Sequence, residues 1–278
     1  MQTVSLTITQ SWELAGVLMA SGTALAFVPD RRAQLAGAFA REVSIIGFLY
    51  GLWHYVGDLA AAGTSGAVAH AHTIERIERD LHLPSERWTQ HLVLDHPLVV
   101  QGANLYYATM HFTGMLLFLL WLFVRHRDRY RPIRQVMAWT TLACLLVQLI
   151  PVAPPRMLPG IVDTGLRYHQ SVYSGGLAAD QLSSMPSVHV AWAVLVGWYV
   201  WRVSPSRWRW IGPAHAVLTV LIVVVTGNHY WLDGIVAVLL LAICAWGVAG
   251  VQALWRRLRA HLQPRLTARL RPAQEARV

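Results

Sequence analysis

The sequence predicts an all-α integral membrane protein, and three observations lead to that expectation. Of the 278 residues, 55% are hydrophobic and only 13% are charged, whereas a soluble domain carries roughly 25% charged residues. Several apolar stretches approach the roughly 20 residues that an α-helix needs to cross a bilayer. The arginines gather between these stretches. We therefore expect one membrane-embedded unit without a separate soluble domain.

The apolar runs define the expected spans in chain order. They are 12–28, 42–62, 98–124, 135–152, 186–203, 210–226 and 229–252. Residues 24–26 resemble a signal-peptide cleavage site, which leaves cleavage of the first span open. No basic residue precedes this span, however, and Arg31 and Arg32 follow it, so a retained helix is favoured. We expect an N-terminal helix and cytoplasmic link over 1–40, a transmembrane domain over 41–255 and a basic cytoplasmic tail over 256–278.

The arginines predict the orientation in the membrane. All 23 basic residues are arginine, and eighteen lie in the segments 31–41, 125–134, 202–209 and 256–277. Because basic residues favour the cytoplasmic side, these segments are expected to be cytoplasmic. The loop 153–185 and the turn near 227 then share the extracytoplasmic face of the cell membrane. The net charge of +9 is explained without nucleic acid, since no soluble basic domain is present.

Residues 70–90 are too charged to be a span. Apolar positions at helical spacing predict an amphipathic helix on the membrane surface. The expected apolar face holds Ile74, Ile77 and Leu81, and the expected polar face holds Glu75, Arg76, Glu78 and Arg79. A role in lipid entry and a plain structural lid are both consistent with this pattern.

The turn before the last span carries the first chemical motif, residues 226–233 (Thr-Gly-Asn-His-Tyr-Trp-Leu-Asp). A spacing of four places His229 and Asp233 on one face of a helix. The carboxylate can then accept the Nδ1–H of the imidazole and leave Nε2 as a nucleophile. Ionisable groups at membrane depth are costly and usually functional. A structural hydrogen bond between helix and loop is the alternative.

The second motif, residues 184–189 (Ser-Met-Pro-Ser-Val-His), opens an apolar helix. Ser187 is suited to cap that helix, and free amides of a first helical turn bind anions. His189 can act there as a general acid. An ordinary capped helix with a hydrogen-bonded histidine remains the alternative.

The loop 153–183 supplies candidate cations. Arg156 follows two prolines, and Arg167 lies eleven residues later. A guanidinium binds phosphate oxygens in a bidentate manner. Contact with lipid headgroups is the alternative for both arginines. Cys144 and Cys244 are isolated and indicate neither a disulfide framework nor a metal site.

These motifs together resemble the type 2 phosphatidic acid phosphatase (PAP2) superfamily. The closer resemblance is to the branch with inositol phosphorylceramide synthase and bacterial inositol phosphotransferase-like proteins. It is carried by 153–156, 185–189 and 227–233, with 104–107 and His111 in support, and covers roughly 40–253. The resemblance implies a six-helix transmembrane bundle, to which this chain adds one N-terminal helix and the interfacial helix. Residues 41–255 would then be the catalytic domain.

The resemblance also implies roles for individual residues. His229 would form a phosphohistidine, Asp233 would orient it, and His189 would exchange protons with the leaving and accepting groups. Ser187 and Arg156 would hold the phosphate, with no metal and no other cofactor. Possible substrate-binding residues are Asn104, Tyr107, His111, Arg167, Tyr168, His169, Asn228 and Tyr230.

The sequence departs from the family pattern at three positions. Val188 replaces a glycine, and Leu149 and Val223 stand where a lysine and an arginine are expected. Two of three phosphate-binding cations are therefore missing. This favours a single phosphodiester or monoester over a pyrophosphate.

The expected function is metal-independent phosphotransfer on a lipid phosphate ester in a bacterial cell membrane. A lipid alcohol or a polyol such as inositol would accept the phospho-headgroup. Water as the acceptor would make the protein a lipid phosphate phosphatase, and both reactions need the same residues. A catalytically silent lipid-binding or transport protein is the alternative from another class. The motifs do not determine the oligomeric state.

Overall fold

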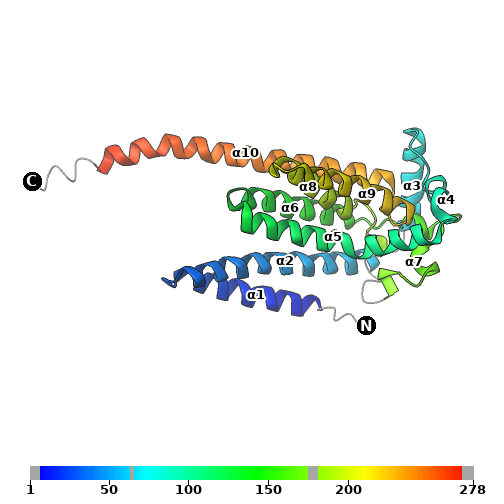
Figure 1. Cartoon of the computed structure of the whole chain (residues 1–278), viewed down its shortest axis with the longest axis horizontal. Coiled ribbons are helices and arrows are strands. Elements are labelled where there is room, and N and C mark those ends of the chain that lie inside the picture. Colours follow the sequence, from blue (N-terminus) through cyan, green and yellow to red (C-terminus); the bar gives the residue numbers. More distant parts are fainter. Residues whose placement is uncertain (1–6, 63–65, 175–180, 271–278) are drawn as a thin grey trace, which may run out of the picture.

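The computed structural model describes residues 7–62, 66–174 and 181–270. The described residues form helices that run mostly along one axis, with shorter helices gathered at one end (Figure 1). Extended pairing within them is limited to an isolated bridge between Val152 and Ser183. The expectation of an all-α protein is thus confirmed. Residues 271–278 of the expected basic tail lie outside the described residues.

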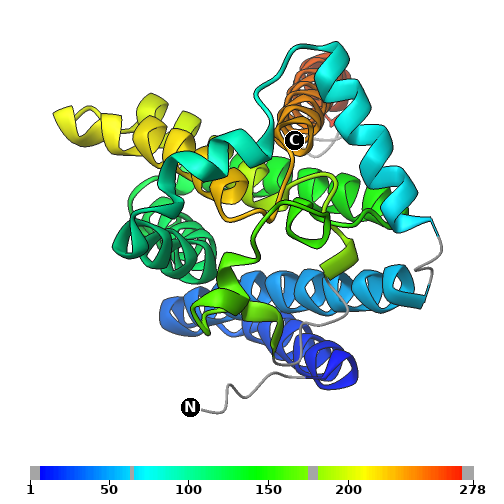
Figure 2. The ribbon, with the colours of Figure 1, turned by 90° about the vertical axis from the view of Figure 1, so that its right-hand side faces the viewer.

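The N-terminal part is a helical hairpin. It consists of α1 (Ile8–Ala24), the 3-10 turn η1 (Leu25–Phe27) and α2 (Arg31–Ala62). Thr7 caps α1 through a reciprocal pair of hydrogen bonds with Gln10, which satisfies two amides at the helix start. The hairpin lies along one side of the remaining helices (Figure 2).

Five longer helices form the bundle. They are α5 (Pro97–Arg125), α6 (Arg127–Gln148), α8 (Val188–Val203), α9 (Ile211–Val225) and α10 (Trp231–Leu270). The largest core cluster includes Leu122 of α5, Cys144 of α6, Leu195 of α8 and Ala237 of α10. The short η5 (Arg207–Trp210) precedes α9. The core therefore fixes where α8 and α10 begin relative to each other.

Four helical segments are long and apolar enough to cross a membrane: Arg31–Leu59, Pro97–Arg125, Arg207–Val225 and Trp231–His261. The shorter Val188–Val203 is also apolar. These segments make the chain a multi-pass membrane protein. Each of the seven expected spans contains a helix, but only four meet this criterion. Several helices also extend beyond the apolar runs. For example, α2 and α6 begin in arginine-containing sequence, because arginine is a good helix former.

The expected surface helix is two helices, α3 (Ala67–Asp80) and α4 (Glu86–Leu94). One position of the expected polar face differs, because Glu78 is buried, while contact of Ile77 and Leu81 with the membrane surface stays a prediction. Ala71, Ile74 and Glu78 are buried, whereas Ile77 and Leu81 are exposed. The buried face includes a carboxyl group because that group bonds to the start of α10.

The loop between α6 and α8 contains three short elements. They are η2 (Pro155–Met157), α7 (Thr164–Arg167) and η3 (Val172–Ser174). Together with α3 and α4 they lie at one end of the bundle (Figure 1). Both histidine motifs open toward this end.

Candidate active site

A cavity of about 130 Å³ lies where the two histidine motifs meet. This is roughly ten times the volume that one water molecule requires. His189 and His229 both line it, together with Arg156 and Asn228. Its other walls come from α2, α5 and the loop that follows η2. The cavity is thus enclosed by segments from nearly the whole chain.

The turn between α9 and α10 sets the position of His229. The backbone amides of Asn228 and His229 both donate to the carbonyl of Val223, at 3.0 and 3.1 Å. Gly227 has a φ of +71°, and a Cβ added there would lie 3.1 Å from Cβ of Arg156. Glycine is required because L-residues are strained at this φ and the arginine backbone approaches closely. The turn therefore places His229, the candidate nucleophile, close to Arg156, the candidate phosphate-binding cation.

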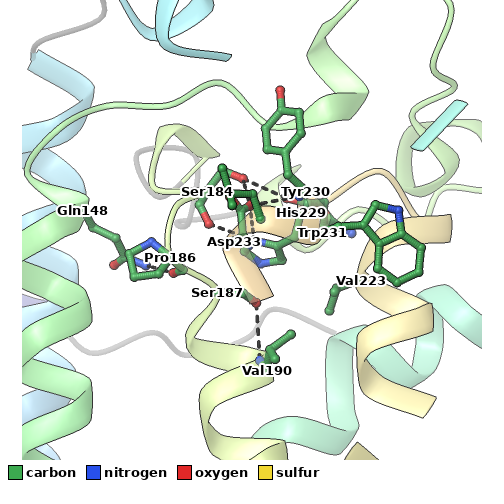
Figure 3. Close-up of polar contacts among 12 residues, drawn as sticks. Gln148, Ser184, Pro186, Ser187, Val190, Val223, His229, Tyr230, Trp231 and Asp233 are labelled. Atoms are coloured by element: carbon green, nitrogen blue, oxygen red, sulfur yellow. Dashed lines mark hydrogen bonds and ion pairs between the residues drawn. The ribbon is translucent and has the colours of Figure 1, made fainter. Parts of the chain in front are cut away.

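His229 is held through its Nδ1 atom. This atom lies 2.8 Å from the carbonyl oxygen of Ser184 and 3.1 Å from Oδ2 of Asp233. Oδ2 also accepts from the Ser184 hydroxyl at 2.8 Å and from the Tyr230 amide at 3.0 Å. Figure 3 shows these groups gathered around the first turn of α10. Two acceptors at Nδ1 favour the tautomer that carries its proton on this atom, with the Nε2 lone pair free to attack.

His189 lies in the first turn of α8. Ser187 caps this helix by accepting from the Val190 amide at 3.3 Å (Figure 3). The His189 ring centroid lies 5.4 Å from that of His229 and 4.0 Å from that of His111. Tyr107 stacks on His189, with centroids 4.5 Å apart and planes inclined by 19°. The two rings of the motifs are therefore close enough to contact one small group.

Arg156 is buried but only partly neutralised. Its Nε atom lies 3.3 Å from Oδ2 of Asp163, and its Nη1 donates to Oδ1 of Asn228 at 2.8 Å. Its guanidinium carbon lies 4.3 Å from the centroid of the Tyr173 ring. Nη2 has no hydrogen-bond partner among the described residues. Because an unpaired buried donor is costly, this atom is suited to bind an anionic oxygen in the cavity.

Other predicted site residues support the scaffold. Asn104 accepts from the Thr164 hydroxyl at 2.8 Å and donates to the Thr164 carbonyl at 3.0 Å, which fastens α7 to α5. The Tyr230 hydroxyl donates to the carbonyl of Ala153. Ser187 is fully buried at the start of α8 and is not among the cavity-lining residues. Contact of these three side chains with substrate stays a prediction.

Arg167, Tyr168 and His169 do not line the cavity. Arg167 and His169 are exposed, and the Arg167 guanidinium lies over the Tyr168 ring at 5.7 Å. Tyr107 and His111, by contrast, do line it. The structure therefore gathers six predicted residues around one space, and Asp233 holds one of them, His229, without lining the cavity itself. The six are His189, His229, Arg156, Asn228, Tyr107 and His111.

Several residues that line the cavity were not predicted from the sequence. Tyr50, Trp53 and His54 come from α2, and Gln148 and Tyr173 complete the wall. Tyr50 and His54 carry polar groups and lie four residues apart in the mostly apolar second half of α2, which places them on one face. That spacing was a usable signal. Tyr173 had none, because its position depends on the fold of a loop.

Two buried carboxyl groups also went unnoticed. Glu78 accepts a hydrogen bond of 2.7 Å from the Leu232 amide, and Glu86 accepts one of 3.4 Å from the Trp231 amide. Both side chains thus bind free amides at the start of α10. Burial, followed by the neighbouring Glu86 carboxyl, raises the pKa of Glu78 to about 9. Burial also raises the pKa of Glu86.

Comparison with known proteins gives one match. Residues 72–247 match the family model described as PAP2 superfamily. The matched segment contains both histidine motifs, Arg156 and Asp233. No curated protein and no solved structure matches the chain.

Proposed function

This chain belongs to the PAP2 superfamily, and on that premise we propose that it is a membrane-embedded phosphotransferase for lipid phosphate esters. The reaction passes through a phosphohistidine at His229 and transfers a phospho-headgroup to or from a lipid or polyol alcohol. One observation carries this proposal. The ring centroids of His229 and His189 lie 5.4 Å apart, and both rings line one cavity. Arg156 lines it too, and its Nη2 atom has no hydrogen-bond partner among the described residues.

In the first half-reaction, Nε2 of His229 attacks the phosphorus. A new N–P bond forms while the bond to the leaving oxygen breaks. The Nδ1–H of His229 points to Asp233 Oδ2 at 3.1 Å, so the carboxylate stabilises the positive charge that develops on the ring. His189, in its protonated form, donates its proton to the leaving oxygen. Arg156 and the amides at the start of α8 bind the phosphate oxygens.

In the second half-reaction, His189 returns to its protonated form. It removes the proton from the accepting hydroxyl, whose oxygen attacks the phosphorus as the N–P bond breaks. This step restores neutral His229 with its Nδ1–H intact. A lipid alcohol or a polyol such as inositol gives a phosphodiester product, whereas water gives a phosphatase reaction. The same side chains serve both outcomes.

The cation content of the cavity favours a substrate with a single phosphate. Among the described residues, Arg156 is the only arginine that lines it. The positions where the family pattern has two further cations hold Leu149 and Val223, of which Leu149 is 44% exposed and Val223 contributes its backbone carbonyl to the His229 turn. A pyrophosphate carries more charge than one guanidinium neutralises. A phosphodiester or monoester is therefore the better match.

The proposed topology has seven spans. The bundle of α2, α5, α6, α8, α9 and α10 is joined by α1 as the additional N-terminal helix. The arginine-rich connections near 31, 126 and 205 lie at the end opposite to α3 and α4 (Figure 1), which supports an extracytoplasmic site. Under this arrangement a lipid phosphate enters from the outer leaflet of a bacterial cell membrane.

The deciding experiment is product analysis with purified protein in vesicles. The donor is a phosphatidylinositol-type lipid, and the acceptor is a lipid alcohol. We expect a phosphodiester product that depends on both components. Release of inorganic phosphate alone from lipid monophosphates would assign a phosphatase instead. Binding of the donor without any turnover would assign a carrier.

A further inference from the structure

A second, apolar cavity lies between the α1–α2 hairpin and the bundle. It measures about 480 Å³, within the roughly 300–1,000 Å³ of ordinary ligand pockets. Figure 2 shows the hairpin lying along the side of the bundle. Representative lining residues are Leu14, Leu18, Val43, Ile46, Met115 and Met137.

This apolar cavity adjoins the catalytic cavity. Tyr50, Trp53 and Phe112 line both spaces. The Trp53 and Phe112 rings are in contact, with centroids 5.5 Å apart. These rings lie between the two spaces, so a chain attached to a phosphate at His229 reaches the apolar space by displacing or passing them.

Hydrogen bonds between α1 and α2 hold the two helices of the hairpin together. The Ser44 hydroxyl donates to the Ala15 carbonyl at 2.6 Å, and Trp12 Nε1 donates to the Phe48 carbonyl at 3.3 Å. A Cβ on Gly22 would lie 2.6 Å from the carbonyl oxygen of Gly37, so the two helices pack backbone to backbone. A wall held in this way keeps a defined shape against an occupant.

The chemistry of the lining identifies the occupant as an alkyl chain. No charged residue lines this cavity. The Thr141 hydroxyl, one of its few polar groups, already donates to the Met137 carbonyl and accepts from Trp192 Nε1. A polyol would lose most of its hydrogen bonds to water there, because Ser11 Oγ is the one unpaired hydroxyl among the described lining residues. An alkyl chain loses none.

We propose that this cavity holds one acyl chain of the lipid whose phosphate reaches His229, so that the N-terminal hairpin selects the substrate by its tail. This inference rests on the proposed function. It adds that the hairpin recognises the acyl chain of the substrate. Both α1 and α2 precede the family-matched residues 72–247, so the match itself does not describe the hairpin. Because bilayer tails are already in apolar surroundings, the cavity acts through shape and selects among tails.

The test compares two neighbouring substitutions on α1. Leu18 lines the cavity, whereas Val17 is 63% exposed. With Leu18→Trp, kcat/KM for a palmitoyl donor falls about tenfold or more, while kcat/KM for the hexanoyl donor with the same headgroup is retained. The matched Val17→Trp leaves both donors unchanged. Equal behaviour of the two variants on both donors overturns the proposal.

A binding measurement separates this proposal from the proposed function. A palmitoyl phosphatidic acid with a diazirine near the tail end is cross-linked to the full chain in vesicles. We expect labelling within residues 11–18 and 43–53 that Leu18→Trp abolishes and Val17→Trp preserves. If this pattern appears without turnover, the catalytic assignment fails and the tail site stands. If turnover occurs and labelling ignores Leu18→Trp, the tail site is wrong.

Discussion

The side-chain Oε1 of Glu78 on α3 accepts a 2.7 Å hydrogen bond from the amide of Leu232, in the first turn of α10. Leu232 directly precedes Asp233, whose Oδ2 atom lies 3.1 Å from Nδ1 of His229. A buried acid outside the histidine motifs thus fixes the helix start that positions both members of the pair. Glu86 adds a second bond to the same helix start, at the Trp231 amide.

The first prediction concerns pH and stability. The pKa of Glu78 rises from an ordinary 4.5 to about 9 in the folded protein, chiefly because the group is buried. The folded state therefore retains a proton that the unfolded state has lost. Stability is full below the ordinary value and falls as pH rises toward 9. Thermal unfolding followed by tryptophan fluorescence should show Tm falling by about 5 °C or more over this range.

The variant Glu78→Gln tests the origin of that slope. Its amide oxygen still accepts from Leu232 but cannot ionise, so Tm should depend less on pH than in the wild type. Glu13→Gln, at an exposed position of α1, is the matched control and should keep the wild-type slope. If Tm depended equally on pH in the wild type, Glu78→Gln and Glu13→Gln, Glu78 would not be the cause of that dependence.

The second prediction concerns the nucleophile. His229→Ala should lower turnover by about 10³-fold or more, because no other group can form the covalent intermediate. Binding of the lipid donor should persist, since Arg156 and the cavity walls remain. Phosphate release and donor binding are measured on the same vesicles. His91→Ala, on the exposed face of α4, should behave as wild type, and normal turnover in His229→Ala would identify a different nucleophile.

The third prediction separates orientation from binding. Asp233→Asn should lower kcat by about 10²–10⁴-fold with little change in KM, because the amide no longer stabilises the charged ring. Ser184→Ala removes one hydrogen bond to the carboxylate, so a smaller loss of about tenfold is expected. A change confined to KM in either variant would contradict an orienting role.

The fourth prediction concerns the single cation of the cavity. Arg156→Lys should lower kcat/KM by about 10–100-fold, because an ammonium cannot bind Asp163, Asn228 and a phosphate oxygen together. Steady-state kinetics over a range of donor concentrations measures this loss. Arg76→Lys changes an exposed arginine of α3 and should be neutral. Equal kinetics in both variants would mean that the phosphate binds elsewhere.

The fifth prediction concerns the turn at Gly227. Gly227→Ala places a methyl group 3.1 Å from Cβ of Arg156 and forces a non-glycine residue to φ +71°, at a cost of about 1–3 kcal/mol. Both Tm and kcat/KM should fall. In Gly247→Ala the new Cβ meets nothing within 4 Å, so stability should be kept or raised. A wild-type Tm in Gly227→Ala would show that the turn tolerates another path.

Much of the fold follows from local sequence. Apolar runs predict helices because burial of the backbone in a membrane requires internal hydrogen bonding, and each expected span contains a helix. The spacing of His229 and Asp233 likewise predicts that they share a helix face, and the structure has them 3.1 Å apart. These features depend on residues within one or two helical turns of each other.

Contacts between distant segments could not be derived in this way. Arg156 and Arg167 lie in one loop with the same side chain, yet only Arg156 reaches the cavity, because η2 packs against Gly227. Glu78 was expected on the polar face of α3 but is buried, because the start of α10 supplies a donor to it from 154 residues away.

The sequence by itself determined which helices form and which two residues of the last motif pair, because hydrophobic runs and four-residue spacing act locally. Only the tertiary structure decided that the ring centroids of His189 and His229 lie 5.4 Å apart. It also decided that Tyr50, Trp53 and His54 of α2 line the same cavity. The physical reason is that a side chain's neighbours across a bundle are set by how whole helices pack. That packing depends on all of their faces at once.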